Sequence, residues 1–197
     1  MKVVLIGQKS FAAAVMSKLL DEGREIVCVI CPPSDPIAHA VDGSPIKLVQ
    51  TNRPAANDIP AETDIIVCAH NHAYLSAAVV SKSRLGAISY HPSMLPRHRG
   101  RDAVRWTVKM NDAIAGGTVY WVDEGVDTGP IAAQEWCWVE PGMTASDLWR
   151  EKLFPAGVRL ISRVLHNIDQ GHIVRMRQNE KVATFEPAFA SAKLERE

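Results

Sequence analysis

The chain is organised around two stretches, residues 87–100 (AISYHPSMLPRHRG) and residues 122–130 (VDEGVDTGP). Each is a short apolar run that ends in polar residues and then in proline or glycine, a pattern that predicts a strand followed by a loop. The first strand delivers His91 to its loop, and Asp127 lies in the second loop. A histidine and a carboxylate in such positions form a common acid–base pair. We therefore expect a candidate catalytic site where these two loops meet.

Outward from these stretches, the pattern predicts an α/β fold. Residues 2–6, 25–30 and 64–69 are apolar runs typical of strands buried on both faces of a parallel sheet. Ser10 and Asp102 are candidate helix caps, for helices that end before Gly23 and at Met110. A further helix is expected over residues 73–81, and a hairpin returns through residues 131–139. The expected fold is doubly wound, with a mostly parallel sheet.

The C-terminal third is expected to contain a long helix and then a surface tail. Thr144 and Asp147 form a capping pair at the start of the helix, and Pro155 interrupts it or begins a second helix. From about Gly171 the sequence becomes polar, as in a segment that runs over the surface. We expect residues 1–197 to form one domain, with no additional C-terminal domain for tRNA or sugar binding.

Composition narrows the class of partner. The 22 basic and 22 acidic residues cancel, and no broad basic face is evident, so we expect no nucleic-acid partner. No apolar run is long enough for a bilayer and no leader precedes the first strand, so a cytoplasmic protein without a membrane partner is expected. The four cysteines have no framework spacing, and Cys28 and Cys31 are expected to be buried structural residues. All five tryptophans are expected in the core. The oligomeric state stays open.

The motifs from His91 to Gly100 and from Asp123 to Gly129 closely resemble those of the folate-dependent formyltransferase family. The resemblance is stronger to the hydrolase domain of 10-formyltetrahydrofolate dehydrogenase than to methionyl-tRNA or glycinamide ribonucleotide formyltransferases. Weaker likeness extends from residues 2–8 to residues 183–186. It implies a Rossmann-like formyltransferase fold, 10-formyltetrahydrofolate as formyl donor, and a small-molecule acceptor.

The resemblance also implies roles for two residues. His91 and Asp127 match the family's histidine and the last aspartate of its second motif. His91 can donate to the oxygen of the tetrahedral intermediate or protonate the leaving nitrogen, and Asp127 can orient His91 and accept the proton of the nucleophile. An isolated pair of this kind is more often structural than catalytic, but the double motif favours catalysis.

Ser89 departs from the family pattern. Formyltransferases have an asparagine two residues before the histidine, and its amide binds the oxyanion. Losing one such donor costs about 10²–10³ in rate, part of which the Ser89 hydroxyl, or a water that it holds, can replace. A nucleophilic Ser89 is rejected, because side chains two residues apart on a strand are about 6.5 Å apart. We expect formyl transfer to an amine, with hydrolysis or folate binding with little turnover as alternatives.

The residues that the resemblance assigns to the folate are Ala73, Tyr74, Leu75, Arg97, Gly100, Asp123, Glu124, Gly125 and Val126. Arg97 has a competing interpretation as a solvated cation at the rim. His70 and His72, with Cys68, could instead form a metal site on one face of a strand. Lone pairs of this spacing are usually not metal sites, so we expect none.

Overall fold

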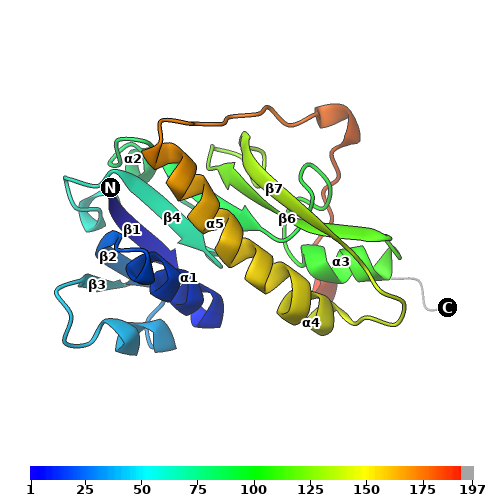
Figure 1. Ribbon diagram of the computed structural model, residues 1–197, viewed down its shortest axis with the longest axis horizontal. Helices are drawn as coiled ribbons and strands as arrows, with labels where there is room; N and C mark the ends of the chain where they lie inside the picture. Colours follow the sequence, from blue (N-terminus) through cyan, green and yellow to red (C-terminus); the bar gives the residue numbers. More distant parts are fainter. Residues whose placement is uncertain (192–197) are drawn as a thin grey trace.

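One seven-stranded sheet forms the centre of the computed structural model, which describes residues 1–191 (Figure 1). The strand order is β3-β2-β1-β4-β5-β6-β7; β1 to β5 are parallel, and β6 and β7 are antiparallel to their neighbours. The strands are β1 (Lys2–Gly7), β2 (Glu25–Cys31), β3 (Lys47–Gln50), β4 (Ile65–Ala69), β5 (Ala87–His91), β6 (Ile114–Trp121) and β7 (Ile131–Trp138). The order reverses between β1 and β4, which confirms the doubly wound, mostly parallel sheet.

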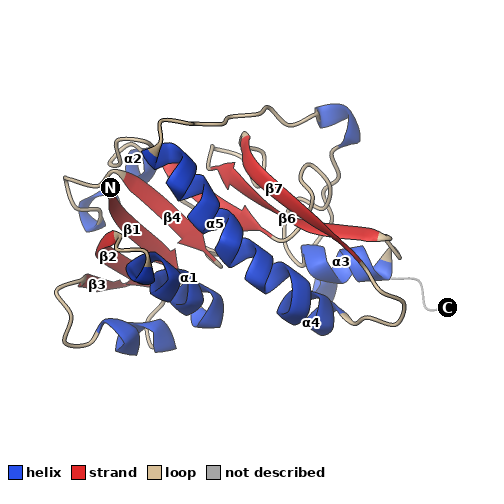
Figure 2. Ribbon diagram, viewed as in Figure 1, coloured by secondary structure: helices blue, strands red, loops and turns tan. Residues whose placement is uncertain are grey.

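Helices cover both faces of this sheet. They are α1 (Lys9–Asp21), α2 (Ala77–Val80), α3 (Ala103–Lys109), α4 (Ala145–Asp147) and α5 (Phe154–Asp169), with a π-helical segment η3 (Leu148–Leu153) before α5. Figure 2 shows α1 and α5 side by side across one face. Helix α5 contributes a strip of buried residues at helical spacing, including Leu160, Val164 and Ile168. These residues pack on the main core with Phe11 and Trp121, and α2 covers a smaller core on the opposite face.

The ends of several helices differ from the expected ones. The helix expected from residue 73 begins only at Ala77, and Gln8, not Ser10, precedes the first turn of α1. Asp102 adopts a left-handed conformation and does not cap α3; its carboxylate accepts a hydrogen bond from the Phe189 amide, which tertiary folding brings close. The capping pair of Thr144 and Asp147 is confirmed.

The tryptophan expectation is wrong at the sheet edge. Trp106 and Trp121 are buried, but Trp136 and Trp138 are 56% and 60% exposed. Both lie on β7, the last strand of the sheet. Residues two apart on a strand share a face, and helix α5 packs on only one face of this sheet. The sequence pattern could not show which face a helix covers.

Cys28 and Cys31 are buried, as the sequence predicted. Both lie in β2, and burial raises the pKa of the Cys28 thiol to about 11.

Across residues 1–191, the structure offers no helix with the length and apolar character needed to cross a membrane.

Candidate active site

His91 and Asp127 meet at the edge of the sheet where the parallel strands end. His91 is the last residue of β5, and Asp127 lies in the loop between β6 and β7. The Nδ1 atom of His91 is 3.4 Å from Oδ2 of Asp127, and their side chains are only 9% and 14% exposed. Electrostatic interactions between side chains buried in this way are weakly screened by solvent. The structure thus brings together the two residues that the sequence motifs singled out.

The His91 ring is held at both nitrogen atoms. Its Nε2 atom lies 2.7 Å from the carbonyl oxygen of His98. A carbonyl oxygen can only accept, so Nε2 carries a hydrogen and donates it. With Nδ1 directed at Asp127, the plane of the imidazole is fixed by two loops.

Asp127 is positioned by two further donors. The Tyr120 hydroxyl donates to Oδ1 at 2.7 Å, and the Gly100 amide donates to Oδ2 at 2.8 Å. Gly100, which the resemblance assigned to the folate, therefore contacts the carboxylate in this structure. Asp127 itself has a φ of 56°, in the left-handed region that costs a non-glycine residue about 1–2 kcal/mol. These contacts help to maintain that conformation.

Sequence reasoning missed Tyr120. The alternation of β6 could have placed it on the same face as Thr118, but only the strand pairing brings it opposite Ser89. Burial, aided by the Asp127 carboxylate, raises the pKa of Tyr120 well above its ordinary value, while the Ser89 hydroxyl acts in the opposite sense through a hydrogen bond. Ser89 therefore faces the Tyr120 hydroxyl, on the same strand face as His91.

Removing the Tyr120 hydroxyl should weaken the site without unfolding the protein. In Tyr120→Phe, Oδ1 of Asp127 loses its hydroxyl donor, and we expect kcat to fall about tenfold, because one hydrogen bond to a carboxylate is worth about 1.5 kcal/mol. Steady-state kinetics with 10-formyltetrahydrofolate, the donor that the resemblance implies, would measure this. Tyr90→Phe is the matched control, because the Tyr90 hydroxyl donates to the Leu153 carbonyl in the core. A turnover equal to that of the unmodified protein in Tyr120→Phe would contradict this role.

The other residues expected at the folate lie in the segment after β4 and in the loop before Asp127. Leu75 is buried, and Tyr74 is 66% exposed. The loop that contains Asp123 is folded on itself, because the Asp123 carboxylate accepts from the Gly125 amide and from the Thr128 hydroxyl. Glu124 and Val126 are exposed beside them, and Ala73 hydrogen-bonds the Asn71 side chain.

Arg97 is engaged elsewhere. Its Nε and Nη2 atoms each donate to the Asp112 carboxylate at 2.8 Å. A fork of two parallel hydrogen bonds is a strong and specific pairing. The guanidinium is thus paired with Asp112 while its side chain is still 41% exposed, and its contact with the folate stays a prediction.

A cavity of about 250 Å³ lies at the reversal of the strand order. Its lining comes from the ends of β1, β2 and β4 and from the loop after β3, and includes Gln8, Thr51, Asn52, His70 and His72. The rings of His70 and His72 are 5.0 Å apart. Burial lowers the pKa of His70 to about 4, with smaller contributions from His72 and Lys9. Burial likewise lowers the pKa of His72, so the cavity presents neutral polar groups near neutral pH.

The cavity is not part of a recognisable metal cluster. Within residues 1–191, no group of three or more histidine, cysteine, aspartate or glutamate side chains is arranged to hold a metal ion.

The burial of His70 predicts a pH dependence of stability. Because its pKa is about 4 when folded and about 6.5 when unfolded, the unfolded chain binds more protons between these values. The free energy of unfolding should therefore fall as the pH is lowered from about 6.5 to about 4. His70→Gln should lose less stability over this window in urea titrations, whereas His39→Gln, at an exposed histidine, should follow the unmodified protein. Parallel curves for all three proteins would contradict the prediction.

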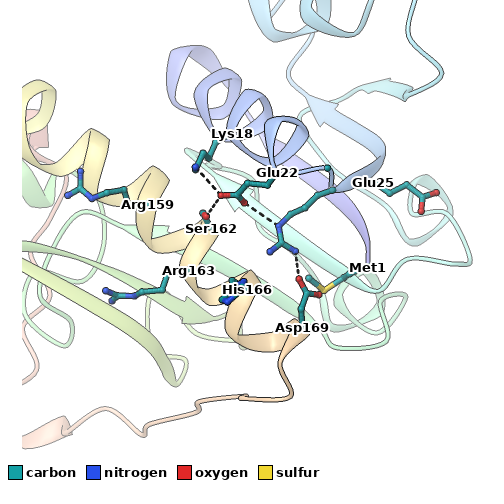
Figure 3. Close-up of a pocket in the computed structure, with 11 residues that line it drawn as sticks. Met1, Lys18, Glu22, Glu25, Arg159, Ser162, Arg163, His166 and Asp169 are labelled. Carbon is teal, nitrogen blue, oxygen red and sulfur yellow. Dashed lines mark hydrogen bonds and ion pairs between the residues drawn. The ribbon is translucent and has the colours of Figure 1, made fainter.

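A larger hollow of about 780 Å³ lies elsewhere, between α1 and α5 (Figure 3). Its charged groups largely pair with one another: Arg24 bonds both Glu22 and Asp169, and Lys18 also pairs with Glu22. It neighbours the beginning of β1 and β2, at the edge of the sheet opposite His91. We interpret it as a solvated groove between two helices.

The sequence and the fold are similar to those of known proteins. Residues 1–165 match the family model described as formyl transferase. The chain belongs to the formyl transferase family. This confirms the family expected from the two motifs, and the fold agrees with it.

Relatives of this family member fall into several classes. Mitochondrial 10-formyltetrahydrofolate dehydrogenase of Mus musculus is 36% identical in an alignment 204 positions long, which covers 94% of this chain and 22% of the relative. The chain thus spans about a fifth of the length of that protein. Methionyl-tRNA formyltransferase of Acidobacterium capsulatum is 28% identical, over 95% of this chain and 65% of the relative.

A solved structure confirms the fold alone, because its sequence identity is low. The N-formyltransferase of Helicobacter canadensis, in complex with folinic acid and dTDP-3-aminofucose, has a TM-score of 0.80 at 19% identity. The superposition covers 94% of this chain and 70% of the chain in that structure.

Proposed function

We propose that this chain transfers the formyl group of 10-formyltetrahydrofolate to an amine of a small-molecule acceptor. The observation that carries the proposal is the buried pair of His91 and Asp127, 3.4 Å apart at the end of the parallel strands. Ligands of doubly wound sheets bind at this edge. Membership of the formyl transferase family supports the formyl group as the one transferred.

The two side chains supply the proton transfers that the reaction needs. The acceptor amine attacks the formyl carbon, its proton passes to Asp127 directly or through a water, and the oxyanion forms close to His91. The bond from the formyl carbon to N10 then breaks, and N10 takes a proton from His91. Asp127 then passes the proton that it took up to His91, whose Nδ1 atom is 3.4 Å from Oδ2 of Asp127. Both side chains return to their starting states, so one proton has moved from the acceptor nitrogen to the folate nitrogen.

The folate is proposed to lie between two segments beside the pair. Residues 73–75 follow β4, and residues 123–126 precede Asp127. The exposed ring of Tyr74 is available for stacking on the pterin, and the loop around Asp123 offers main-chain groups. The cavity beside His70 and His72 is the proposed place of the acceptor. Its neutral polar lining suits an acceptor that is uncharged where it enters the cavity.

Hydrolysis to formate and tetrahydrofolate is the second candidate function. The position at which the family has an asparagine is occupied by Ser89, whose hydroxyl faces Tyr120. Two hydroxyl groups beside a carboxylate can hold a water as the nucleophile. The similarity to 10-formyltetrahydrofolate dehydrogenases also supports hydrolysis as the candidate reaction.

One assay separates these functions. Purified protein is incubated with 10-formyltetrahydrofolate, and release of tetrahydrofolate is followed with and without a panel of amines. Release that depends on one class of amine would establish the transferase and name the acceptor class. Equal release without any amine would favour the hydrolase. Binding of the folate without release under any condition would contradict both and favour a folate-binding protein.

A further inference from the structure

We propose that Gln178 is a positioning residue that sets Asp127 beside His91. The inference rests on the proposed function, because it assigns the residues that hold that function's catalytic pair. The sequence predicted a surface tail from about Gly171. Most of this segment is exposed, but Gln178 is only 5% exposed.

The segment returns from the end of α5 to the two loops of the site (orange to red in Figure 1). Met176 pairs with Ile131 at the start of β7 through two main-chain hydrogen bonds. Farther along, Thr184 donates to the Pro96 carbonyl and accepts from the Arg99 amide. The segment therefore contacts the loop after Asp127 and the loop after His91.

The Gln178 side chain connects these loops through a single buried amide. Its Nε2 group donates to the carbonyl oxygens of Asp127 at 2.9 Å and Gly129 at 2.7 Å. Its Oε1 atom accepts from Nε of Arg99 at 3.1 Å and from Nη2 at 2.8 Å. Arg99 can only donate and a carbonyl can only accept, so this orientation of the amide is the one that satisfies all partners.

Both connected loops contain a residue in the left-handed conformation. Asp127 and His98 each have a φ of 56°. The carbonyl of His98 accepts from Nε2 of His91, and Arg99 is the next residue. Such conformations persist where surrounding contacts determine them. The Gln178 amide thus holds the main chain of Asp127 directly. It also bonds Arg99, which is the residue after His98, whose carbonyl oxygen bonds His91.

Arg99 gives the amide a fixed support. Its side chain is 7% exposed, and its two terminal nitrogens donate to the Glu180 carboxylate at 2.8 and 2.7 Å. Glu180 lies two residues after Gln178, so the returning segment contacts Arg99 twice. A displacement of about 1 Å at a reacting group can cost about 10² in rate, so this support matters for Asp127.

Two substitutions test the inference. Gln178→Met keeps the size of the side chain and removes all four hydrogen bonds. Gln178→Glu can still accept from Arg99 but cannot donate to the two carbonyls. For both we expect kcat to fall about 10²-fold while KM for 10-formyltetrahydrofolate changes less than about threefold. Arg177→Gln, at the exposed neighbour, is the control and should retain full turnover.

A normal kcat in either folded Gln178 variant would overturn the inference, as would a loss of activity that only follows the loss of folded protein. A crystal structure of Gln178→Met tests positioning without any substrate. We expect the distance from His91 Nδ1 to Asp127 Oδ2 to exceed the present 3.4 Å, and an unchanged distance would overturn the inference. If the proposed function itself were wrong, the unmodified protein would release no tetrahydrofolate. That result differs from one in which only the Gln178 variants behave unexpectedly.

Discussion

Asp127→Asn and His91→Ala are each expected to lower turnover of 10-formyltetrahydrofolate by about 10³-fold. Asparagine has the shape of aspartate, and its single carbonyl oxygen can still accept from the Gly100 amide while its NH2 group donates to the Tyr120 oxygen. It carries no charge, however, and cannot take the proton of a nucleophile. His91→Ala removes the donor that would protonate N10. Steady-state release of tetrahydrofolate measures both effects.

Folate binding should persist in these variants, because the proposed folate contacts come from residues 73–75 and 123–126. Equilibrium titration should give a Kd within about threefold of that of the unmodified protein. Asp64→Asn is the matched control: its carboxylate bonds Lys2 and Arg84 at the beginning of β4, away from His91. Near-full turnover in either Asp127→Asn or His91→Ala would show that the proposed mechanism is wrong.

Gly129→Ala should be the most destabilising substitution in the second motif. A Cβ atom at residue 129 would lie 1.7 Å from the Trp121 carbonyl oxygen and 2.9 Å from its carbon. Both are main-chain atoms at the end of β6, so the strand and the loop must move apart. The Gly129 carbonyl also accepts from Gln178, and that contact would be lost. We expect a loss of about 3 kcal/mol in the free energy of unfolding, measured by urea denaturation.

Gly142→Ala separates this steric effect from the general cost of replacing glycine. Gly142 has a φ of 81°, and an added Cβ atom would meet no atom within 4 Å. Its conformational cost should be about 1 kcal/mol. Equal destabilisation of the two variants would mean that the contact with Trp121 does not limit residue 129. Turnover should fall in Gly129→Ala and stay normal in Gly142→Ala.

Local patterns predicted most of the scaffold. The apolar runs of β1, β2 and β4 are buried strands, because a strand covered on both faces needs apolar side chains at every position. Thr144 and Asp147 form the expected cap because capping depends on residues three apart in the sequence. Where neighbours distant in sequence intervene, local reasoning failed. Asp102 bonds the Phe189 amide instead of capping α3, and the β7 tryptophans are exposed because α5 packs on the other face of that strand.

The sequence by itself determined the doubly wound fold, the family and the two residues that meet at its edge, because strand periodicity and loop motifs are local properties. Only the tertiary structure decided what holds that pair. Tyr120 reaches Asp127 because the loop after β6 turns back toward that strand, and Gln178 is brought back 51 residues along the chain to the Asp127 carbonyl. The sequence around a polar side chain does not indicate a hydrogen-bond partner so far along the chain, because only the folded tertiary structure brings the two residues together.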